Sequence, residues 1–241
     1  MARAAKLVQH IPILMTRPKG SNQRFIDRIA PDLSKRLRVV SSPLIAIKPL
    51  GSPVRIDPED AAVFTSGNGV LHAPPGDGRR AYCVGEQTTG RAQQAGWDAI
   101  CAGFDAAALI DTLRQIAPSQ PLHHFHGVHV RVDVVAELKK LGLDATATPV
   151  YDQVLQPFSE EALQTLSEKA PVLVPLFSPR TAEHFAELAP STARAIIIAM
   201  STAVADPCGR AGFGPVYVAQ EPTAQSMVNC LEKWLTETRP G

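Results

Sequence analysis

The stretch AYCVGEQTTGRAQQAGW (Ala81 to Trp97) has a counterpart in AIIIAMSTAVADPCGRAGF (Ala195 to Phe213). Both begin with an apolar run typical of a buried strand, pass through hydroxyl-bearing residues into a helical pattern, and end on Ala-Gly-aromatic. The segments upstream also match, because VFTSGNGV (Val63 to Val70) is echoed by LFSPRTA (Leu176 to Ala182). This duplication predicts two similar strand–helix units within one chain.

Apolar strands alternate with amphipathic helices along most of the sequence, which predicts the α/β class with parallel sheets covered on both faces. The clearest helix is TAQSMVNCLEKWL (223–235), where Met227, Leu231 and Trp234 share a face and Thr223 is placed as the N-cap. In VVAELKKLGL (134–143), Gly142 is the expected end of a second helix.

Two stretches differ from this alternation, because SSPLIAIKPLGSP (41–53) and ATATPVYDQVLQP (145–157) are extended and flanked by prolines. We therefore expect an inserted α/β domain at residues 50–146 within an outer domain made of residues 1–42 and 156–241. Residues 43–49 and 147–155 are the expected linker strands, paired antiparallel as a hinge. Ligands of open α/β sheets bind beyond the carboxyl ends of the strands, so we expect those ends to face a shared cleft.

Composition excludes several classes of partner. Lys and Arg number 24 against 23 Asp and Glu, and aromatic residues make up 5% of the chain. This charge balance provides no positive electrostatic field to attract nucleic acid, and so few aromatic residues provide no platform for stacking bases. The N-terminal apolar run is broken by Pro12 and stopped by Arg17, and no run has the length of a membrane span. Four cysteines without a C-x-x-C pair indicate reduced thiols, so we expect a cytoplasmic protein.

The familiar catalytic motifs are missing: the sequence has no Walker loop, no G-x-S-x-G and no H-E-x-x-H. HHFHGVH (123–129) places His124 and His126 on one face of a strand, as zinc ligands are placed. No acidic or cysteine partner stands at ligand spacing, so we do not expect a metal site here. A partly exposed strand end is the preferred interpretation.

Polar residues recur at the junctions where an expected strand ends and the next helix begins. Such a junction offers free backbone N–H groups, a hydroxyl and the positive end of a helix dipole. One junction alone is only an N-cap, but several facing one cleft predict a binding surface for a ligand with many carboxylates. The junctions are Thr16-Arg17, Thr65-Ser66-Gly67-Asn68, Gly85-Glu86-Gln87-Thr88, Ser178-Pro179-Arg180 and Ser201-Thr202.

In this order the motifs resemble the uroporphyrinogen-III synthase family, and the resemblance covers nearly the whole chain. No single motif is diagnostic, but the series is specific. The motifs are LMTRP, PLIAIKP, VFTSGNGV, VGEQTTGRAQQAGW, HGVHVRVDVVAELKKLGLDATATPVYD, LFSPRTAEHF, AMSTA and AQEPTAQSM.

The resemblance implies two flavodoxin-like parallel-sheet domains joined by a two-stranded antiparallel linker. It implies hydroxymethylbilane as a small-molecule substrate, closed with loss of water and inversion of the last pyrrole ring to uroporphyrinogen III. It also implies no cofactor and no metal. We further expect a monomer without nucleic-acid or membrane partners. The family's candidate proton donor matches Tyr151, which is otherwise read as a tyrosine that packs the hinge. The implied substrate-binding residues are Arg17, Thr65, Ser66, Asn68, Thr88, His126, Gly127, Arg131, Ser178, Ser201 and Thr202.

The chain departs from the family pattern at several positions. Ala46 stands where an acid is common, His126 where an arginine is common, and Ala199 where a glycine is usual. Pro207 is expected to interrupt the helix that follows Ser201. These departures leave a second interpretation open, a non-catalytic two-lobed protein that binds an acidic small molecule.

Overall fold

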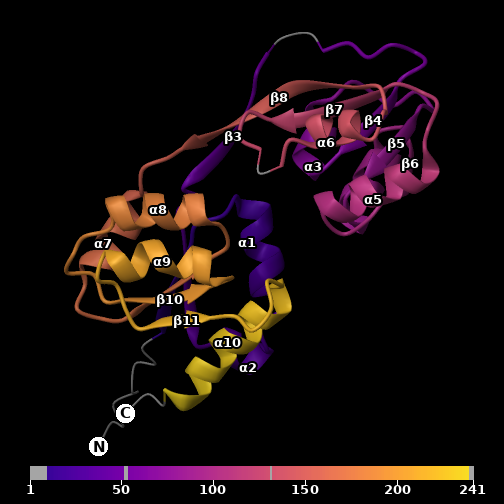
Figure 1. The fold of residues 1–241 in the computed structure, drawn as a ribbon. Helices are drawn as coiled ribbons and strands as arrows, with labels where there is room; N and C mark the ends of the chain where they lie inside the picture. The colour runs from indigo at the N-terminus through magenta and orange to yellow at the C-terminus, as the bar shows by residue number, and fades with distance from the viewer. Residues whose placement is uncertain (1–9, 52–53, 131, 239–241) are drawn as a thin grey trace, which may run out of the picture. The chain divides into compact units, whose positions relative to one another are not determined.

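The computed structural model describes residues 10–51, 54–130 and 132–238. Contacts divide the chain into two compact units: unit 1 contains the residues up to Ala46 and from Leu155 onward, and unit 2 is Ile47–Val154. Each unit has its own sheet, with most of its strands labelled in Figure 1, and these sheets are built mainly from parallel strands. The predicted α/β class with two parallel sheets is therefore confirmed.

The sheet of unit 1 is parallel throughout, in the order β11-β10-β9-β1-β2. Read from β2, this is the flavodoxin order, in which the first strand lies between the second and the third. The three central strands are buried along nearly their whole length because helices cover both faces. The strands are β1 (Ile11–Met15), β2 (Leu37–Ser41), β9 (Val172–Leu176), β10 (Ala195–Ala199) and β11 (Val216–Val218).

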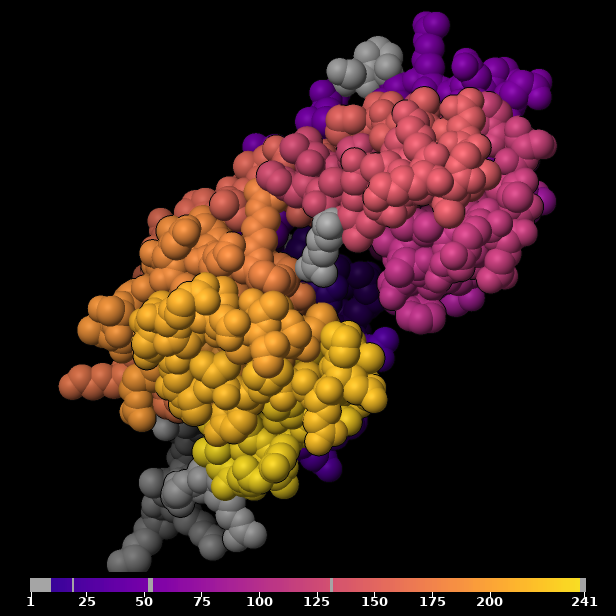
Figure 2. All heavy atoms as spheres, viewed as in Figure 1, coloured from indigo at the N-terminus to yellow at the C-terminus, as the bar shows by residue number. Residues whose placement is uncertain are grey.

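Two apolar clusters hold the helices of unit 1 to the two faces of this sheet. Leu14, Val174 and Phe185 belong to the cluster under α7, α8 and α9, whereas Ile13, Met227 and Trp234 belong to the cluster under α1 and α10. Helices α8 and α9 lie side by side and form a continuous part of the surface in Figure 2. The helices are α1 (Lys19–Ile26), α2 (Pro31–Ser34), α7 (Glu160–Ser167), α8 (Pro179–Leu188), α9 (Thr202–Arg210) and α10 (Ala224–Glu237).

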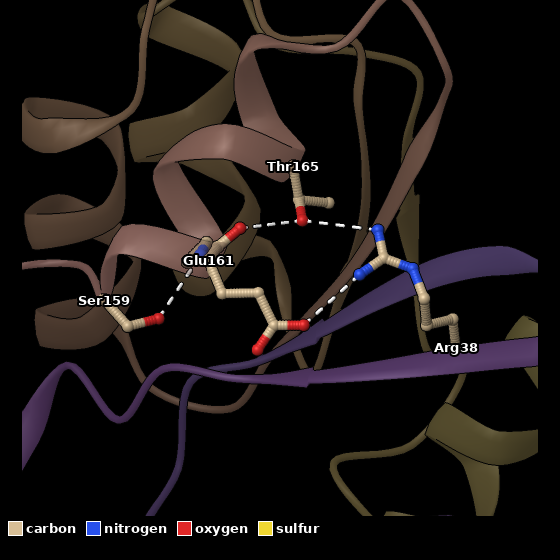
Figure 3. Close-up of polar contacts among 5 residues, drawn as sticks. Arg38, Ser159, Glu161 and Thr165 are labelled. Atoms are coloured by element: carbon tan, nitrogen blue, oxygen red, sulfur yellow. Dashed lines mark hydrogen bonds and ion pairs between the residues drawn. The ribbon is translucent and has the colours of Figure 1, made fainter.

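Polar contacts fix helix α7 against strand β2, as Figure 3 shows. The guanidinium of Arg38 donates to Glu161 Oε1 at 3.3 Å and to Thr165 Oγ1 at 3.4 Å. The Ser159 hydroxyl accepts from the N–H of Ala162 at 3.3 Å and caps the helix. These contacts lie on the exposed side of the unit and add modestly to the apolar packing beneath.

The sheet of unit 2 has the order β3-β8-β7-β4-β5-β6, and its strands from β8 to β6 are parallel. Strand β3 lies beside β8, and the Leu50 N–H donates to the Val150 carbonyl at 3.2 Å. The antiparallel linker between the domains stays a prediction. The strands are β3 (Ile45–Pro49), β4 (Ala61–Phe64), β5 (Arg80–Cys83), β6 (Asp98–Cys101), β7 (Leu122–Gly127) and β8 (Ala145–Leu155); the helices are α3 (Gly67–His72), α4 (Glu86–Gln94), α5 (Ala106–Ile116) and α6 (Val134–Lys140).

The two sheets share one arrangement with a permuted chain order. In unit 1 the consecutive strands β9, β10 and β11 are neighbours, and β1 and β2 extend the sheet beyond β9. In unit 2 the consecutive strands β4, β5 and β6 are neighbours, and β7 and β8 extend the sheet beyond β4. In the chain, the pair β1–β2 comes before the consecutive strands β9, β10 and β11. The pair β7–β8 comes after the consecutive strands β4, β5 and β6. The duplicated sequence therefore corresponds to the first two of the three shared strands, β4 and β5 in unit 2 and β9 and β10 in unit 1, with the helices that follow them.

The repeated Ala-Gly-aromatic ending is a helix C-cap of one kind in both units. Gly96 and Gly212 follow α4 and α9 with φ of 84° and 82°. The N–H of Trp97 donates to the Ala92 carbonyl at 3.0 Å, and that of Phe213 donates to the Cys208 carbonyl at 3.0 Å. This is the Schellman arrangement, in which glycine takes the left-handed position and the next residue returns to the core.

The predicted interruption at Pro207 is wrong, because α9 continues through this residue to Arg210. Proline removes one N–H from the helical ladder, which costs a single hydrogen bond near the middle of this helix. Val204 and Cys208 on either side are buried in the core of unit 1. Their packing outweighs the local cost. None of the helices in the described part of the chain is long and apolar enough to cross a membrane.

Candidate functional site

All five predicted junctions do connect a strand to a helix. In unit 1 they follow β1, β9 and β10, which are neighbours in the sheet. In unit 2 they follow the neighbouring strands β4 and β5. The carboxyl ends of parallel strands meet at one edge, so each unit gathers its junctions at a single sheet edge.

Tyr151 lies at this edge of unit 2, beside the junction that follows β4. Its phenolic oxygen is 3.2 Å from Ser66 Oγ, and Ser66 in turn caps α3 by accepting from the Gly69 N–H at 3.4 Å. The Tyr151 side chain is 5% exposed and belongs to the core of unit 2. The structure thus places a buried phenol in direct contact with a hydroxyl of the predicted site.

Gly127 makes room for the Tyr151 ring. A Cβ at this position would stand 2.6 Å from Tyr151 Cε2 and 3.0 Å from its hydroxyl oxygen. Strand β7 also shifts register against β8 between His126 and Gly127. Gly127 therefore serves the tyrosine through close packing, a role that the sequence pattern did not reveal.

The histidines of β7 have separate partners. His124 is buried, its Nε2 lies 3.2 Å from Thr65 Oγ1, and burial followed by the charge of His126 lowers its pKa to about 4. The His124 and His126 rings face each other with centroids 5.0 Å apart, as the strand alternation predicted. The His126 Nδ1 lies 2.7 Å from the Gly127 carbonyl, so it carries the proton and Nε2 is the nitrogen available to a ligand.

Histidine 123 is held on the other side of the strand. Its ring nitrogens lie 2.8 Å from Thr148 Oγ1 and 3.0 Å from Thr146 Oγ1. Within the described residues, no group of three His, Cys, Asp or Glu side chains is placed to hold a metal ion.

The remaining predicted residues of unit 2 differ in exposure. Thr88, in the first turn of α4, is buried, whereas Asn68 in α3 is partly exposed. Gly85 occupies the N-cap of α4 with φ of 73° and provides no side-chain cap. Arg131 lies outside the described residues.

Arg17 is the most distinctive residue of the unit 1 edge. Its guanidinium carbon lies 4.4 Å over the Phe177 ring. Burial, followed by repulsion from Arg24, lowers the Arg17 pKa from its usual value. No ion pair of Arg17 occurs among the residues that the structure describes. A partly desolvated cation without an acidic partner favours an anionic ligand.

The two hydroxyl junctions of unit 1 are not equivalent. Ser178 caps α8, accepting from the Thr181 N–H at 3.2 Å, and its Oγ lies 2.8 Å from Thr181 Oγ1. Ser201 holds the N-cap position of α9 in an extended conformation, but its side chain forms no cap hydrogen bond. Thr202 follows it and is exposed. The hydroxyls of Ser201 and Thr202 are therefore not explained by helix capping.

Sequence reasoning missed two features of these edges. His72 packs against Tyr151 with ring centroids 5.9 Å apart, and its Nε2 is buried without a hydrogen-bond partner in the described chain. Thr16 Oγ1 and Asn22 Oδ1, beyond β1, are likewise buried and unpartnered among the residues described. Thr16 belonged to a recognised junction, but nothing in the spacing of a six-residue helix indicated that His72 would reach Tyr151.

A cavity of about 410 Å³ opens at the opposite, amino-terminal edge of the unit 2 sheet. Its walls carry charges that are already paired, Arg79 with Asp77 at 3.5 Å and Arg80 with Asp98 at 3.0 Å. None of the predicted site residues lines it. The cavity is therefore separate from the candidate site.

Comparison with known proteins gives a consistent result. The family model described as uroporphyrinogen-III synthase HemD matches residues 28–229. The structure is similar to uroporphyrinogen-III synthetase from Helicobacter pylori, at 17% identity and a TM-score of 0.66, over 95% of this chain and 100% of that one. A mutant uroporphyrinogen III synthase from Thermus thermophilus is 16% identical over 95% of this chain and 100% of its own, with a TM-score of 0.49. Comparison with curated protein sequences found no match.

The family match covers the unit 2 sheet, every strand of the unit 1 sheet except β1, and four of the five junctions, since Thr16-Arg17 precedes it. Members of this family are lyases that close the tetrapyrrole hydroxymethylbilane, with loss of water, to uroporphyrinogen III in haem biosynthesis. This chain belongs to the uroporphyrinogen-III synthase family, and its reaction is this cyclisation.

Proposed function

We propose that Tyr151 supplies the proton that leaves with the terminal hydroxyl of hydroxymethylbilane, while the junctions of the two units bind the carboxylate arms of the substrate. The observation that carries the proposal is the position of the Tyr151 phenol, 3.2 Å from Ser66 at the carboxyl edge of the unit 2 sheet. The proposed binding residues are Arg17, Thr65, Ser66, Asn68, Thr88, His126, Gly127, Arg131, Ser178, Ser201 and Thr202.

The chemistry requires orientation more than acid–base strength. Departure of the hydroxyl leaves an electrophile that the electron-rich pyrroles attack without help, and the unguided closure yields the other isomer. The enzyme must hold the chain so that the last ring is attacked at its substituted carbon, which is a matter of proximity. One positioned proton donor assists the leaving group.

Hydroxyl, backbone and arginine donors suit carboxylate arms on a protein whose net charge is only +1. Arg17 supports this role most strongly, because its guanidinium is partly desolvated and has no ion pair among the described residues. Ser201 and Thr202 support it because helix capping does not use their hydroxyls.

The alternative role for Tyr151 is packing alone, with no part in the reaction. The observation in its favour is the 5% exposure of Tyr151, which suits a tyrosine kept for packing. The two roles differ in what the phenolic oxygen does.

We expect Tyr151→Phe to lower kcat while product affinity stays nearly unchanged, because the substitution removes only the oxygen. Tyr82→Phe is the matched control, since Tyr82 is also 5% exposed but lies in β5 within another cluster. Turnover of Tyr151→Phe equal to that of the native enzyme would remove Tyr151 from the mechanism.

The carboxylate-binding role is tested by Ser201→Ala. This variant should weaken binding of the oxidised product, uroporphyrin III, without lowering the Tm, because no cap is lost. Ser159→Ala should do the reverse, since it loses the cap of α7 and Ser159 is not among the proposed binding residues. A Tm of Ser201→Ala that falls in step with its affinity would show that Ser201 is only structural.

We also propose that the enzyme works in the cytoplasm as a monomer, without a cofactor and without nucleic-acid or membrane partners. The balanced charge and the cysteine spacing support this proposal. Light scattering of the purified protein at micromolar concentration tests it, and a dimer mass would contradict the monomer.

A further inference from the structure

The hydroxyls of Tyr151 and Ser66 differ in how they are held. Tyr151 is nearly fully buried, with its ring confined by the backbone of Gly127 and the ring of His72. Ser66 is only partly buried, at the end of β4 where α3 begins. A substrate oxygen arriving at this edge therefore meets the serine hydroxyl more readily than the phenol.

Hydrogen-bond accounting gives the direction of the contact. Ser66 Oγ has two lone pairs and one proton. The Gly69 N–H occupies one lone pair at 3.4 Å, and the Tyr151 phenol at 3.2 Å is placed to donate to the other. The Ser66 proton then has no acceptor among the described residues and is free to point outward. If Ser66 instead donated to Tyr151, the proton left without an acceptor would be that of the buried phenol.

We propose that Ser66 is the group that touches the leaving hydroxyl of the substrate and that Tyr151 acts through it, the two forming a proton relay. This inference rests on the proposed function and specifies how the phenol reaches the reacting atoms. It makes Ser66 a catalytic residue in addition to an N-cap, and Tyr151 the positioning residue that supplies its proton.

The step balances within the two side chains and the substrate. The carbon–oxygen bond of the terminal hydroxymethyl group breaks as the pyrrole nitrogen lone pair moves toward the carbon, and the bonding pair leaves with oxygen. The Ser66 proton passes to that oxygen, which departs as water, and the Tyr151 proton moves to Ser66 Oγ, leaving a phenolate. The proton released from the ring carbon after closure returns through Ser66 to Tyr151. The net change is loss of one water.

A double-mutant cycle on the full chain tests the relay. Tyr151→Phe should lower kcat at least about tenfold with little change in KM, and Ser66→Ala should lower kcat to a similar extent, because each interrupts one transfer. The double variant should be no slower than the slower single variant, because either substitution alone already breaks the relay. Ser66→Thr keeps a hydroxyl and should retain turnover within about threefold of the native enzyme.

Helix capping is the alternative explanation for an effect at Ser66, and two variants separate it from the relay. Ser66→Gly removes the hydroxyl but keeps a residue that tolerates the N-cap, so it should fold even if Ser66→Ala does not, and should be as slow as Tyr151→Phe. Ser159→Ala loses a cap of the same kind on α7 and should keep native turnover.

The relay is overturned if the two losses multiply in the double variant, or if the hydroxyl-free variants turn over at the native rate. The proposed function has its own readout in the same assay, the isomer that the native chain makes from hydroxymethylbilane. A native enzyme that gives the III isomer with multiplicative losses would reject the relay alone. A native chain that gives only the I isomer would reject the proposed function, and the relay with it.

Discussion

At His124, burial in unit 2 decides the protonation state of the imidazole. The folded pKa is about 4, whereas the ordinary value is 6.5. Between these values the unfolded chain binds more protons than the folded one. The contribution of His124 to stability is therefore complete above pH 6.5 and is lost as the pH falls toward 4.

We expect His124→Gln to reduce this acid sensitivity. The native protein should lose stability between pH 6.5 and 4.5 with a slope of up to about 1.4 kcal/mol per pH unit from this group alone. Glutamine keeps a polar end near Thr65 but does not titrate. Urea unfolding of both proteins at several pH values measures the difference, and parallel pH profiles would contradict the burial argument.

Gly127 carries the second prediction at this scale. Gly127→Ala would force its new methyl group against the Tyr151 ring, so we expect a loss of about 1–3 kcal/mol in unfolding free energy and a fall in kcat. Gly90→Ala is the control, because a Cβ there meets nothing within 4 Å. Native stability and turnover in Gly127→Ala would show that the ring shifts freely and that its position is not fixed.

Sequence patterns located these residues better than they explained them. Tyr151 and Gly127 were found through a resemblance, but their contact depends on a register shift between β7 and β8 that no periodicity indicates. His72 was missed for a similar reason, since its reach to Tyr151 depends on how α3 lies over β7.

Among the elements, helix α9 offers two glycines with opposite expected effects. Gly212 follows the helix at φ of 82°, where any side chain is strained, so Gly212→Ala should cost about 1 kcal/mol. Gly209 lies inside the helix with open space around its Cα, so Gly209→Ala should gain about 0.5–1 kcal/mol. Thermal or urea unfolding measures both, and changes of the same sign would contradict the C-cap assignment.

Helix ends with a strong local signal were predictable from sequence. Thr223 caps α10 through the Ser226 N–H at 3.1 Å, and Gly142 ends α6 as expected, with φ of 79°. The local rule for proline fails at Pro207, because burial of Val204 and Cys208 decides the outcome there. Local chemistry thus predicts an end better than it predicts whether a packed helix tolerates a defect.

For the whole molecule, the duplication in sequence predicts two related sheets, but it does not predict the order of the strands within them. The shared part, β4 to β6 and β9 to β11, is where the repeated motifs lie. The outer strands are added before the repeat in unit 1 and after it in unit 2. Strand order is set by long-range pairing, which single-sequence patterns do not report.

Every role assigned above depends on closure of hydroxymethylbilane to uroporphyrinogen III by this chain. The most direct measurement incubates the purified protein with hydroxymethylbilane generated in situ, oxidises the products and separates the isomers, beside an enzyme-free control. We expect the III isomer to dominate with the protein, because the bound chain is oriented for inversion of its last ring. A product that is only the I isomer, as in the control, would contradict this activity and show that the chain has kept the fold without the reaction.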